Sequence, residues 1–421
     1  MADEVRLSRL VHVRSRFTRS VSLPRDWERP DALDGYILTP SGRGILERLI
    51  SSLDGTSPAR AWSLTGPYGS GKSAFALFAG QVLGGCDAVG GKARALLKEH
   101  ALPLWRKLTC VSSAASGPAL CPVLVTGTRE PLESALAAGL LAALRRVPAD
   151  RQPRGLAKTL HNLAQPGQGH RTAALVTAFE EALEFVSAPE SGCGGLLLVI
   201  DELGKFLEYA ASHPDEGDVF VLQALAEAAA RAAKPFLIVT ILHQALDRYT
   251  AHISASRRQE WAKIQGRFED VAFEEPTDQV LRLLSQAIER KGPEPLQRSI
   301  ERCGRKLATE ALALGSRVGS LEKKELGELI EACMPLHPAV TLVIGPLFRR
   351  LAQNERSLFA FLSSGEPFGF QEFLHEFRWG PQGGELYRLD RLYDYVATAL
   401  GGALFSQHRG KYWAEVQSVL E

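Results

Sequence analysis

The chain has 421 residues, of which 45% are hydrophobic and 23% are charged, and its net charge is +1. This length allows two or three domains, and the balanced charge excludes a global field that would attract nucleic acid or acidic lipid. No apolar run is long enough to span a bilayer, the first residues lack the apolar core of a secretion signal, and the six cysteines form no C-x-x-C pair. We therefore expect a cytoplasmic protein with reduced thiols and no membrane association.

The first elements are a basic segment and a helix. Residues 1–32 contain seven arginines and are predicted to form a basic N-terminal arm. Thr39 and Pro40 then form a helix start, because threonine caps helices and proline suits the first helical position. This helix should run to about Leu53.

The most specific motif is residues 66–73, Gly-Pro-Tyr-Gly-Ser-Gly-Lys-Ser, which fits the P-loop pattern G-x-x-x-x-G-K-[ST]. An apolar strand at 62–65 precedes it and a helix follows, which is the context the motif requires. Its backbone N–H groups then face the α- and β-phosphates of a nucleotide, and the helix N-terminus adds positive partial charge. The alternative is a chance glycine-rich turn. The predicted phosphate-binding residues are Gly66, Pro67, Tyr68, Gly69, Ser70, Gly71, Lys72, Ser73 and Ala74.

Further strands and helices alternate downstream. A strand is predicted at 121–126, helices at 131–146 and 172–186, and a buried strand at 195–200. A helix at 219–233, a strand at 236–242 and a short strand at 271–273 follow. This alternation predicts an α/β fold: a three-layer P-loop core with a mostly parallel sheet and helical insertions, followed from residue 276 by an α-helical lid.

The strand at 195–200 ends in Asp201 and Glu202, which is the Walker B pattern. We expect Asp201 to hold Mg²⁺ together with Ser73, while Lys72 reaches the β- and γ-phosphates. Glu202 is the predicted general base for the attacking water. The alternative is a pair of exposed acids at a strand–loop junction.

The next strand ends in His243 and Gln244, which are predicted to contact the γ-phosphate or the water. His243 could instead cap the following segment. Thr240 lies deeper in the strand and is the weaker candidate.

Residues 263–276 contain Gly-Arg-Phe followed by an acid, a short strand and a proline, which resembles the second half of the AAA+ module. The resemblance implies that Arg267 is an arginine finger, which stabilises charge on the phosphoryl group of a neighbouring subunit's nucleotide. Arg257 and Arg258 are the next candidates. The alternative is a surface ion pair between Arg267 and Glu269 or Asp270.

The same resemblance implies two further contacts. A lid arginine, Arg349 or Arg350 with Arg356 as a third option, would return to the phosphates as sensor 2, or would simply be structural. Gly35 and Tyr36 precede the first core helix and would pack on the adenine base, although Tyr36 could equally be a core tyrosine.

The whole pattern resembles large prokaryotic ATPases with an origin-recognition-like AAA+ core, often found in anti-phage defence systems. The residues that carry this resemblance are 65–73, 240–244, 261–273 and 354–362. Two features depart from the family pattern. Lys72 and Asp201 are far apart for a minimal core, so helical insertions must intervene, and the sensor position lacks the usual asparagine.

The implied organisation is an arm at 1–32, a P-loop core at 33–275, a helical lid at 276–365 and a C-terminal helical extension at 366–421. The arm is either a solvated tail or a segment laid on the nucleotide edge or on a neighbouring subunit. A final amphipathic helix at 412–421 has no C-cap, so we expect either that the chain is part of something larger or that a partner completes this helix. The basic, aromatic residues 407–412 could touch a phosphate backbone or form a solvated turn.

The expected function is that of an ATPase with ATP and Mg²⁺ as cofactors, coupling turnover to a conformational change on DNA or a protein partner. The resemblance also implies a homo-oligomer or another assembly. A slow-turnover switch that signals or assembles is the second reading. A small-molecule kinase is weaker, because Asp201 and Glu202 suit water activation. A protein kinase is excluded, because its glycine-rich loop and its H-R-D and D-F-G motifs are absent.

Overall fold

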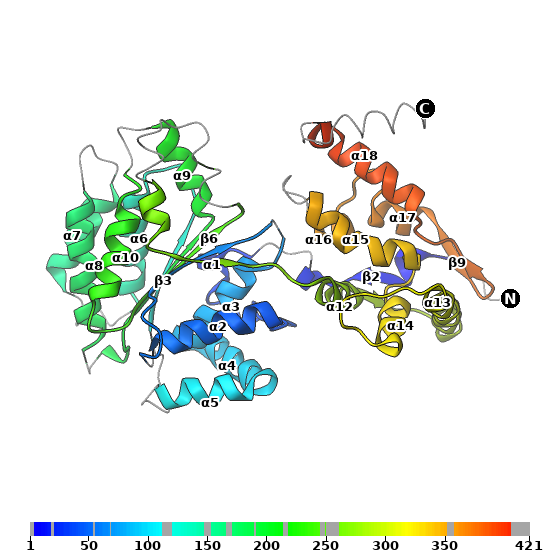
Figure 1. The fold of residues 1–421 in the computed structure, drawn as a ribbon, viewed down its shortest axis with the longest axis horizontal. Helices are drawn as coiled ribbons and strands as arrows, with labels where there is room; N and C mark the ends of the chain where they lie inside the picture. Colours follow the sequence, from blue (N-terminus) through cyan, green and yellow to red (C-terminus); the bar gives the residue numbers. More distant parts are fainter. Residues whose placement is uncertain are drawn as a thin grey trace. The chain divides into compact units, whose positions relative to one another are not determined.

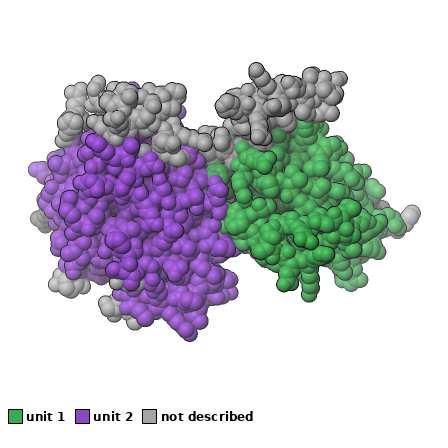
Figure 2. All heavy atoms as spheres, in the orientation of Figure 1, with its two compact units in different colours: residues 1–20, 67–70, 275–421 green, residues 21–66, 71–274 purple. Residues whose placement is uncertain are grey.

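The computed structural model describes residues 4–17, 21–53, 55–67, 69–111, 120–146, 153–165, 171–188, 191–213, 218–244, 249, 261–351 and 358–405. The chain divides into two compact units (Figure 2). Unit 1 comprises residues 1–20, 67–70 and 275–421, and unit 2 comprises residues 21–66 and 71–274.

Unit 2 is built on a five-stranded parallel sheet with the order β4-β5-β6-β3-β7. The strand β6 therefore lies between β3, which leads into the P-loop, and β5, which ends in Asp201. All parallel strands point their carboxyl ends to one edge, so the residues that follow β3, β5 and β6 meet there. The strands are β3 (Ala61–Thr65), β4 (Cys121–Thr126), β5 (Leu196–Asp201), β6 (Phe236–Leu242) and β7 (Glu269–Ala272).

Both faces of this sheet are covered by helices (Figure 1). Along β5, Leu196, Leu198 and Ile200 join a core with one set of helices, while Leu197 and Val199 join a second core on the other face. The first set is α6 (Leu132–Leu144), α7 (Arg154–Ala164), α8 (Thr172–Val186), α9 (Leu203–Ser212) and α10 (Val221–Arg231); the second is α1 (Leu23–Asp26), α2 (Pro40–Leu53), α3 (Lys72–Gly84), α4 (Ala88–His100) and α5 (Leu102–Val111). These layers confirm the predicted three-layer α/β fold.

The predicted start of the first long helix is confirmed. The helix α2 begins at Pro40, and the Thr39 hydroxyl accepts a hydrogen bond of 3.1 Å from the N–H of Gly42. This cap satisfies one of the N–H groups that a helix leaves without an intrahelical partner.

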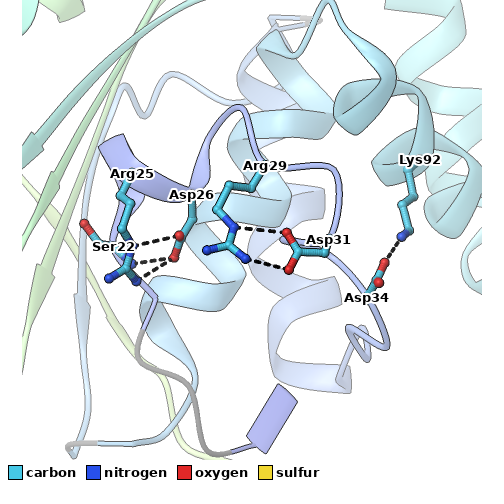
Figure 3. Close-up of polar contacts among 7 residues, drawn as sticks. All are labelled: Ser22, Arg25, Asp26, Arg29, Asp31, Asp34 and Lys92. Carbon is cyan, nitrogen blue, oxygen red and sulfur yellow. Dashed lines mark hydrogen bonds and ion pairs between the residues drawn. The ribbon is translucent and has the colours of Figure 1, made fainter. Parts of the chain in front are cut away.

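Ahead of α2, several basic side chains of the predicted arm pair with acids close in sequence (Figure 3). The Arg25 guanidinium lies 2.9 Å from the Asp26 carboxylate, and that of Arg29 lies 2.7 Å from Asp31. Asp26 also accepts a hydrogen bond from the N–H of Ser22. The charge of these two arginines is therefore balanced within the segment that leads into α2.

Unit 1 is mostly helical, and residues 4–17 take part in it. The strand β1 (Val5–Arg6) pairs with β9 (Arg378–Gly380) in a small three-stranded sheet, and β2 (Val11–Val13) pairs with β8 (Ile288–Arg290). Leu7, Leu10 and Val11 are buried in the same core as Trp379 and Tyr387. The segment predicted as an arm thus contributes both strands and core side chains.

Unit 1 contains five short strands and seven α-helices among its described residues. Its strands are β1 (Val5–Arg6), β2 (Val11–Val13), β8 (Ile288–Arg290), β9 (Arg378–Gly380) and β10 (Gly383–Gly384). Its helices are α12 (Thr277–Ala287), α13 (Glu294–Ala313), α14 (Lys323–Ala332), α15 (Pro338–Leu351), α16 (Leu358–Ser363), α17 (Phe370–Glu376) and α18 (Leu389–Phe405).

The six cysteines are all free thiols. In the described part of the chain, no single helix combines the length and apolarity needed to cross a membrane, and α3 and α4 meet that test only as a pair bent by 100°.

Candidate nucleotide-binding site

The P-loop runs from the end of β3 to the first turn of α3. Gly66 continues the sheet, because its N–H donates to the carbonyl oxygen of Leu242 at the end of β6, at 3.2 Å. Gly69 and Gly71 have φ angles of +70° and +90°, a region that favours glycine. The helix α3 then begins at Lys72. This strand, loop and helix are the context that the sequence motif predicts.

Lys72 places a buried ammonium group at this loop. Its side chain is 3% exposed, and its Nζ donates to the carbonyl oxygen of Gly66 at 2.6 Å. Burial lowers the pKa of Lys72 to about 8, and the charge of Asp201 opposes that shift. An anion is favoured next to a buried cation at a helix N-terminus, because it would replace the hydration that the cation loses on burial.

Ser73 and Asp201 meet at the same edge of the sheet. The Asp201 carboxylate accepts a hydrogen bond of 2.9 Å from the N–H of Glu202. Burial raises the pKa of Asp201, while the Ser73 hydroxyl, the N–H of Glu202 and the charge of Lys72 lower it. The structure therefore brings together the three side chains that the sequence assigned to phosphate and metal.

Glu202 follows directly and has an unusual backbone. Its φ and ψ of 52° and 40° lie in the left-handed region, which costs a residue with a β-carbon about 1–2 kcal/mol. Glutamate therefore occupies a position where glycine would be less strained. Strain of this kind is concentrated at functional sites, where the rest of the structure imposes it.

His243 and Gln244 follow β6 at the same edge. Burial is the main cause that lowers the pKa of His243 to about 3, and the charges of Lys72 and Lys205 add to it. The imidazole is therefore neutral at pH 7. Gln244 lies just beyond the end of β6 and is partly buried. Thr240 is buried within the sheet, where its hydroxyl donates to the carbonyl oxygen of Trp62.

The donor set fits a hard cation that is shared with phosphate. Ser73 and Asp201 offer hydroxyl and carboxylate oxygens, which Mg²⁺ prefers, and Mg²⁺ usually binds through one or two such groups together with phosphates and waters. In the described ranges, no three His, Cys, Asp or Glu side chains are grouped to hold a metal by themselves. The oxygens of Ser73 and Asp201 therefore suit a magnesium ion that is shared with phosphate.

Gly35 and Tyr36 form a turn before α2. Gly35 has a φ of +65°, and the N–H of Tyr36 donates to the carbonyl oxygen of Leu33. The ring of Tyr36 stacks on Phe78 of α3, with centroids 4.5 Å apart. Tyr36 thus lies against the helix that begins at the P-loop and is partly buried there.

The predicted arginines lie in different parts of the chain. The Arg267 side chain is 53% exposed, and its guanidinium lies 3.0 Å from the carboxylate of Glu227 on α10. Arg349 and Arg350 are in the last turn of α15 in unit 1, and Arg349 donates to the carbonyl oxygen of Glu275 at 2.5 Å. Four other predicted residues lie outside the described part of the chain: Tyr68, Arg257, Arg258 and Arg356.

Two residues near Glu202 were not singled out from the sequence. The Nζ of Lys205 lies 2.5 Å from Oε2 of Glu202, and Gly127 packs against the Glu202 backbone. The spacing of Glu202 and Lys205, three apart at the start of a helix, was the available signal for the first contact. The second joins segments distant in sequence, so no local pattern predicts it.

No protein-family model and no curated protein matches this chain. Among solved structures, the chain is similar to the ORC2 protein of Aeropyrum pernix in ADPNP–ADP complexes, at 12% sequence identity and a TM-score of 0.34. The match covers 89% of this chain and 98% of the ORC2 chain. A likeness at this TM-score adds nothing to the assignment of individual residues.

Proposed function

We propose that the chain binds ATP with Mg²⁺ at the carboxyl edge of the unit 2 sheet and hydrolyses it. The observation that carries this proposal is the buried ammonium of Lys72, whose Nζ lies 2.6 Å from the carbonyl oxygen of Gly66 at the edge of the sheet where β5 ends in Asp201. A hydroxyl, a carboxylate and an ammonium at the end of a glycine loop complement a phosphate chain and its cation.

Each of these side chains has a role that follows from its chemistry. Ser73 and Asp201 would hold Mg²⁺, which neutralises phosphate charge when it is bound. Lys72 would leave the carbonyl of Gly66 for the β- and γ-phosphate oxygens. Glu202 would accept a proton from the attacking water, directly or through one bridging water. His243 and Gln244 would orient that water or the γ-phosphate.

Three further roles belong to the proposal. Gly35 and Tyr36 would contact the base, because Tyr36 lies against the helix that begins at the P-loop. Arg267 would leave Glu227 and reach the nucleotide of a neighbouring subunit, since an ion pair this exposed is weak. Arg349 or Arg350 would serve as sensor 2.

From the resemblance of the sequence, we infer that the cycle acts on DNA or on a protein partner. The setting would be a cytoplasmic homo-oligomer or larger assembly in a prokaryotic anti-phage system. The second candidate is a slow-turnover switch. The ion pair between Glu202 and Lys205 favours that reading, because a base engaged by a cation is less available to water.

ATP turnover measured with and without single- and double-stranded DNA tests the proposal, alongside molar mass in each nucleotide state. ATP turnover that is stimulated by DNA supports an ATPase whose cycle acts on DNA. Tight nucleotide binding with turnover near zero in every condition supports the switch. Absence of any ATP binding in the presence of Mg²⁺ would overturn both.

A further inference from the structure

Lys205 is a second cation beside the proposed general base. Its ammonium lies 2.5 Å from Oε2 of Glu202, and its backbone N–H donates to the carbonyl oxygen of the same residue at 3.1 Å. The side chains are 50% and 31% exposed, respectively. Lys205 is therefore held next to Glu202 through both its backbone and its side chain.

The position of Lys205 is unfavourable for helix stability. It is the third residue of α9, and a positive charge in the first turn opposes the helix dipole. The ion pair with Glu202 contributes about 0.2–1 kcal/mol, which is similar in size to the cost of about 0.3–1 kcal/mol for a positive charge in the first turn. Lys205 therefore adds little net stability to the helix.

The surroundings of Lys205 belong to the same edge of the sheet. Its charge and that of Lys72 both act on His243, which follows β6. Glu202 follows β5, and Lys72 follows the loop after β3. The ion pair of Glu202 and Lys205 therefore lies at the edge of the sheet that the P-loop also reaches.

We propose that Lys205 is a positioning residue that responds to the γ-phosphate. Without a triphosphate, its ammonium holds Glu202 by the ion pair. When ATP is bound, the ammonium contacts a γ-phosphate oxygen, and Glu202 is released to accept the proton of the water. This inference rests on the proposed function and adds to it a side chain that distinguishes ATP from ADP.

The exchange is chemically favourable. A terminal phosphate carries more negative charge than a carboxylate and offers three acceptor oxygens. Charge-assisted hydrogen bonds to phosphate are stronger than an exposed carboxylate pair. The resting contact is thus weak enough to be displaced by the nucleotide.

The test compares Lys205→Gln with Lys205→Arg, using Lys234→Gln as the matched control. Lys234 is exposed and precedes β6, so its loss removes the same charge at the opposite edge of the sheet. Binding of ADP and of the non-hydrolysable analogue AMP-PNP is measured by calorimetry with Mg²⁺. We expect Lys205→Gln to lose about tenfold in affinity for AMP-PNP and to keep its affinity for ADP. Lys205→Arg and Lys234→Gln should keep the wild-type ratio of the two affinities.

A double-mutant cycle distinguishes two explanations for a change in AMP-PNP affinity. One is that Lys205 releases Glu202, and the other is simple repulsion between the Glu202 carboxylate and the phosphate. Glu202→Gln should raise AMP-PNP affinity in the wild-type background but not beside Lys205→Gln. An equal gain in both backgrounds, or an unchanged affinity ratio in folded Lys205→Gln protein, overturns the inference. If wild-type protein binds neither nucleotide, the proposed function fails instead.

Discussion

A β-carbon on Gly127 would lie 2.1 Å from the carbonyl oxygen of Glu202. Gly127 follows β4 and Glu202 follows β5, and the N–H of Gly127 donates to the carbonyl oxygen of Asp201 at 2.8 Å. The end of one strand therefore braces the left-handed backbone of the proposed general base. Glycine is required at this contact because the neighbouring atom is backbone and cannot turn away.

Gly127→Ala should therefore impair turnover more than nucleotide binding. The added methyl group must displace Glu202, at an expected cost of about 1–3 kcal/mol in the free energy of unfolding. Steady-state kinetics and urea unfolding measure the two effects. Gly91→Ala is the matched control, because Gly91 lies in α4 with no atom within 4 Å of an added β-carbon. Normal turnover in Gly127→Ala would show that the position of Glu202 does not matter.

Glu202→Gly should make the protein more stable and inactive. Glycine adopts the left-handed conformation of this residue without strain, so we expect a gain of about 1 kcal/mol in the free energy of unfolding. Glu202→Gln keeps the strain and should lose turnover without that gain. Urea unfolding of the two variants provides the comparison. Equal stability would mean that the rest of the fold does not impose the backbone strain.

Nucleotide affinity should fall as the pH rises above about 8, the pKa of Lys72 in the folded protein. Bound phosphate favours the ammonium form, so above this pH binding must take up a proton, and affinity falls up to about tenfold per pH unit. The terminal phosphate is already fully ionised in this range. Calorimetry in two buffers of different ionisation enthalpy at pH 8.5 measures the proton uptake. Lys72→Arg carries a guanidinium that keeps its proton, so any binding it retains should lose this dependence.

The same group affects folding stability in the opposite direction. The unfolded chain keeps the Lys72 proton to about its ordinary pKa of 10.5, whereas the folded protein keeps it only to about 8. Between these values the unfolded state binds more protons, so the contribution of Lys72 to the free energy of unfolding rises with pH. Over this window, increasing pH therefore stabilises the protein through Lys72 while it weakens binding.

Local patterns predicted the central sheet well. Continuous apolar runs identified β5 and β6, because strands buried on both faces lack alternation. The P-loop and the acidic end of β5 predicted that Ser73 and Asp201 would lie at the same edge of the sheet, since parallel strands end at one edge. The motif and the topology were therefore sufficient to place these two residues in the fold.

The remaining features depend on contacts that are distant in the sequence. The pairing of β1 with β9 joins residues at opposite ends of the chain, and strands of two or three residues carry no periodic signal. The packing of Gly127 on Glu202 depends on neighbouring strand ends, and the stacking of Tyr36 on Phe78 depends on the path of a loop. The helix α9 starts directly after Glu202. The acidic motif was predicted there, but the first turn of this helix was not.

Arg267→Ala should abolish turnover with little change in stability, because its ion pair with Glu227 is exposed. If Arg267 acts across a subunit interface, mixing this variant with Glu202→Gln should restore part of the activity. Some interfaces of the mixed assemblies would then combine an intact Arg267 from one subunit with an intact Glu202 from its neighbour. Glu227→Gln is the control, since it breaks the same ion pair and should leave turnover unchanged. No recovery on mixing, in assemblies shown to exchange subunits, would contradict action in trans.

The central claim is that Lys72, Ser73 and Asp201 hold a magnesium triphosphate while Glu202 activates water. ATP binding and phosphate release, measured together on wild type, Lys72→Ala and Glu202→Gln, test it most directly. We predict that Lys72→Ala loses binding, whereas Glu202→Gln binds ATP as tightly as wild type or more tightly and releases no phosphate. Normal ATP affinity in Lys72→Ala, or undiminished hydrolysis in Glu202→Gln, would contradict it.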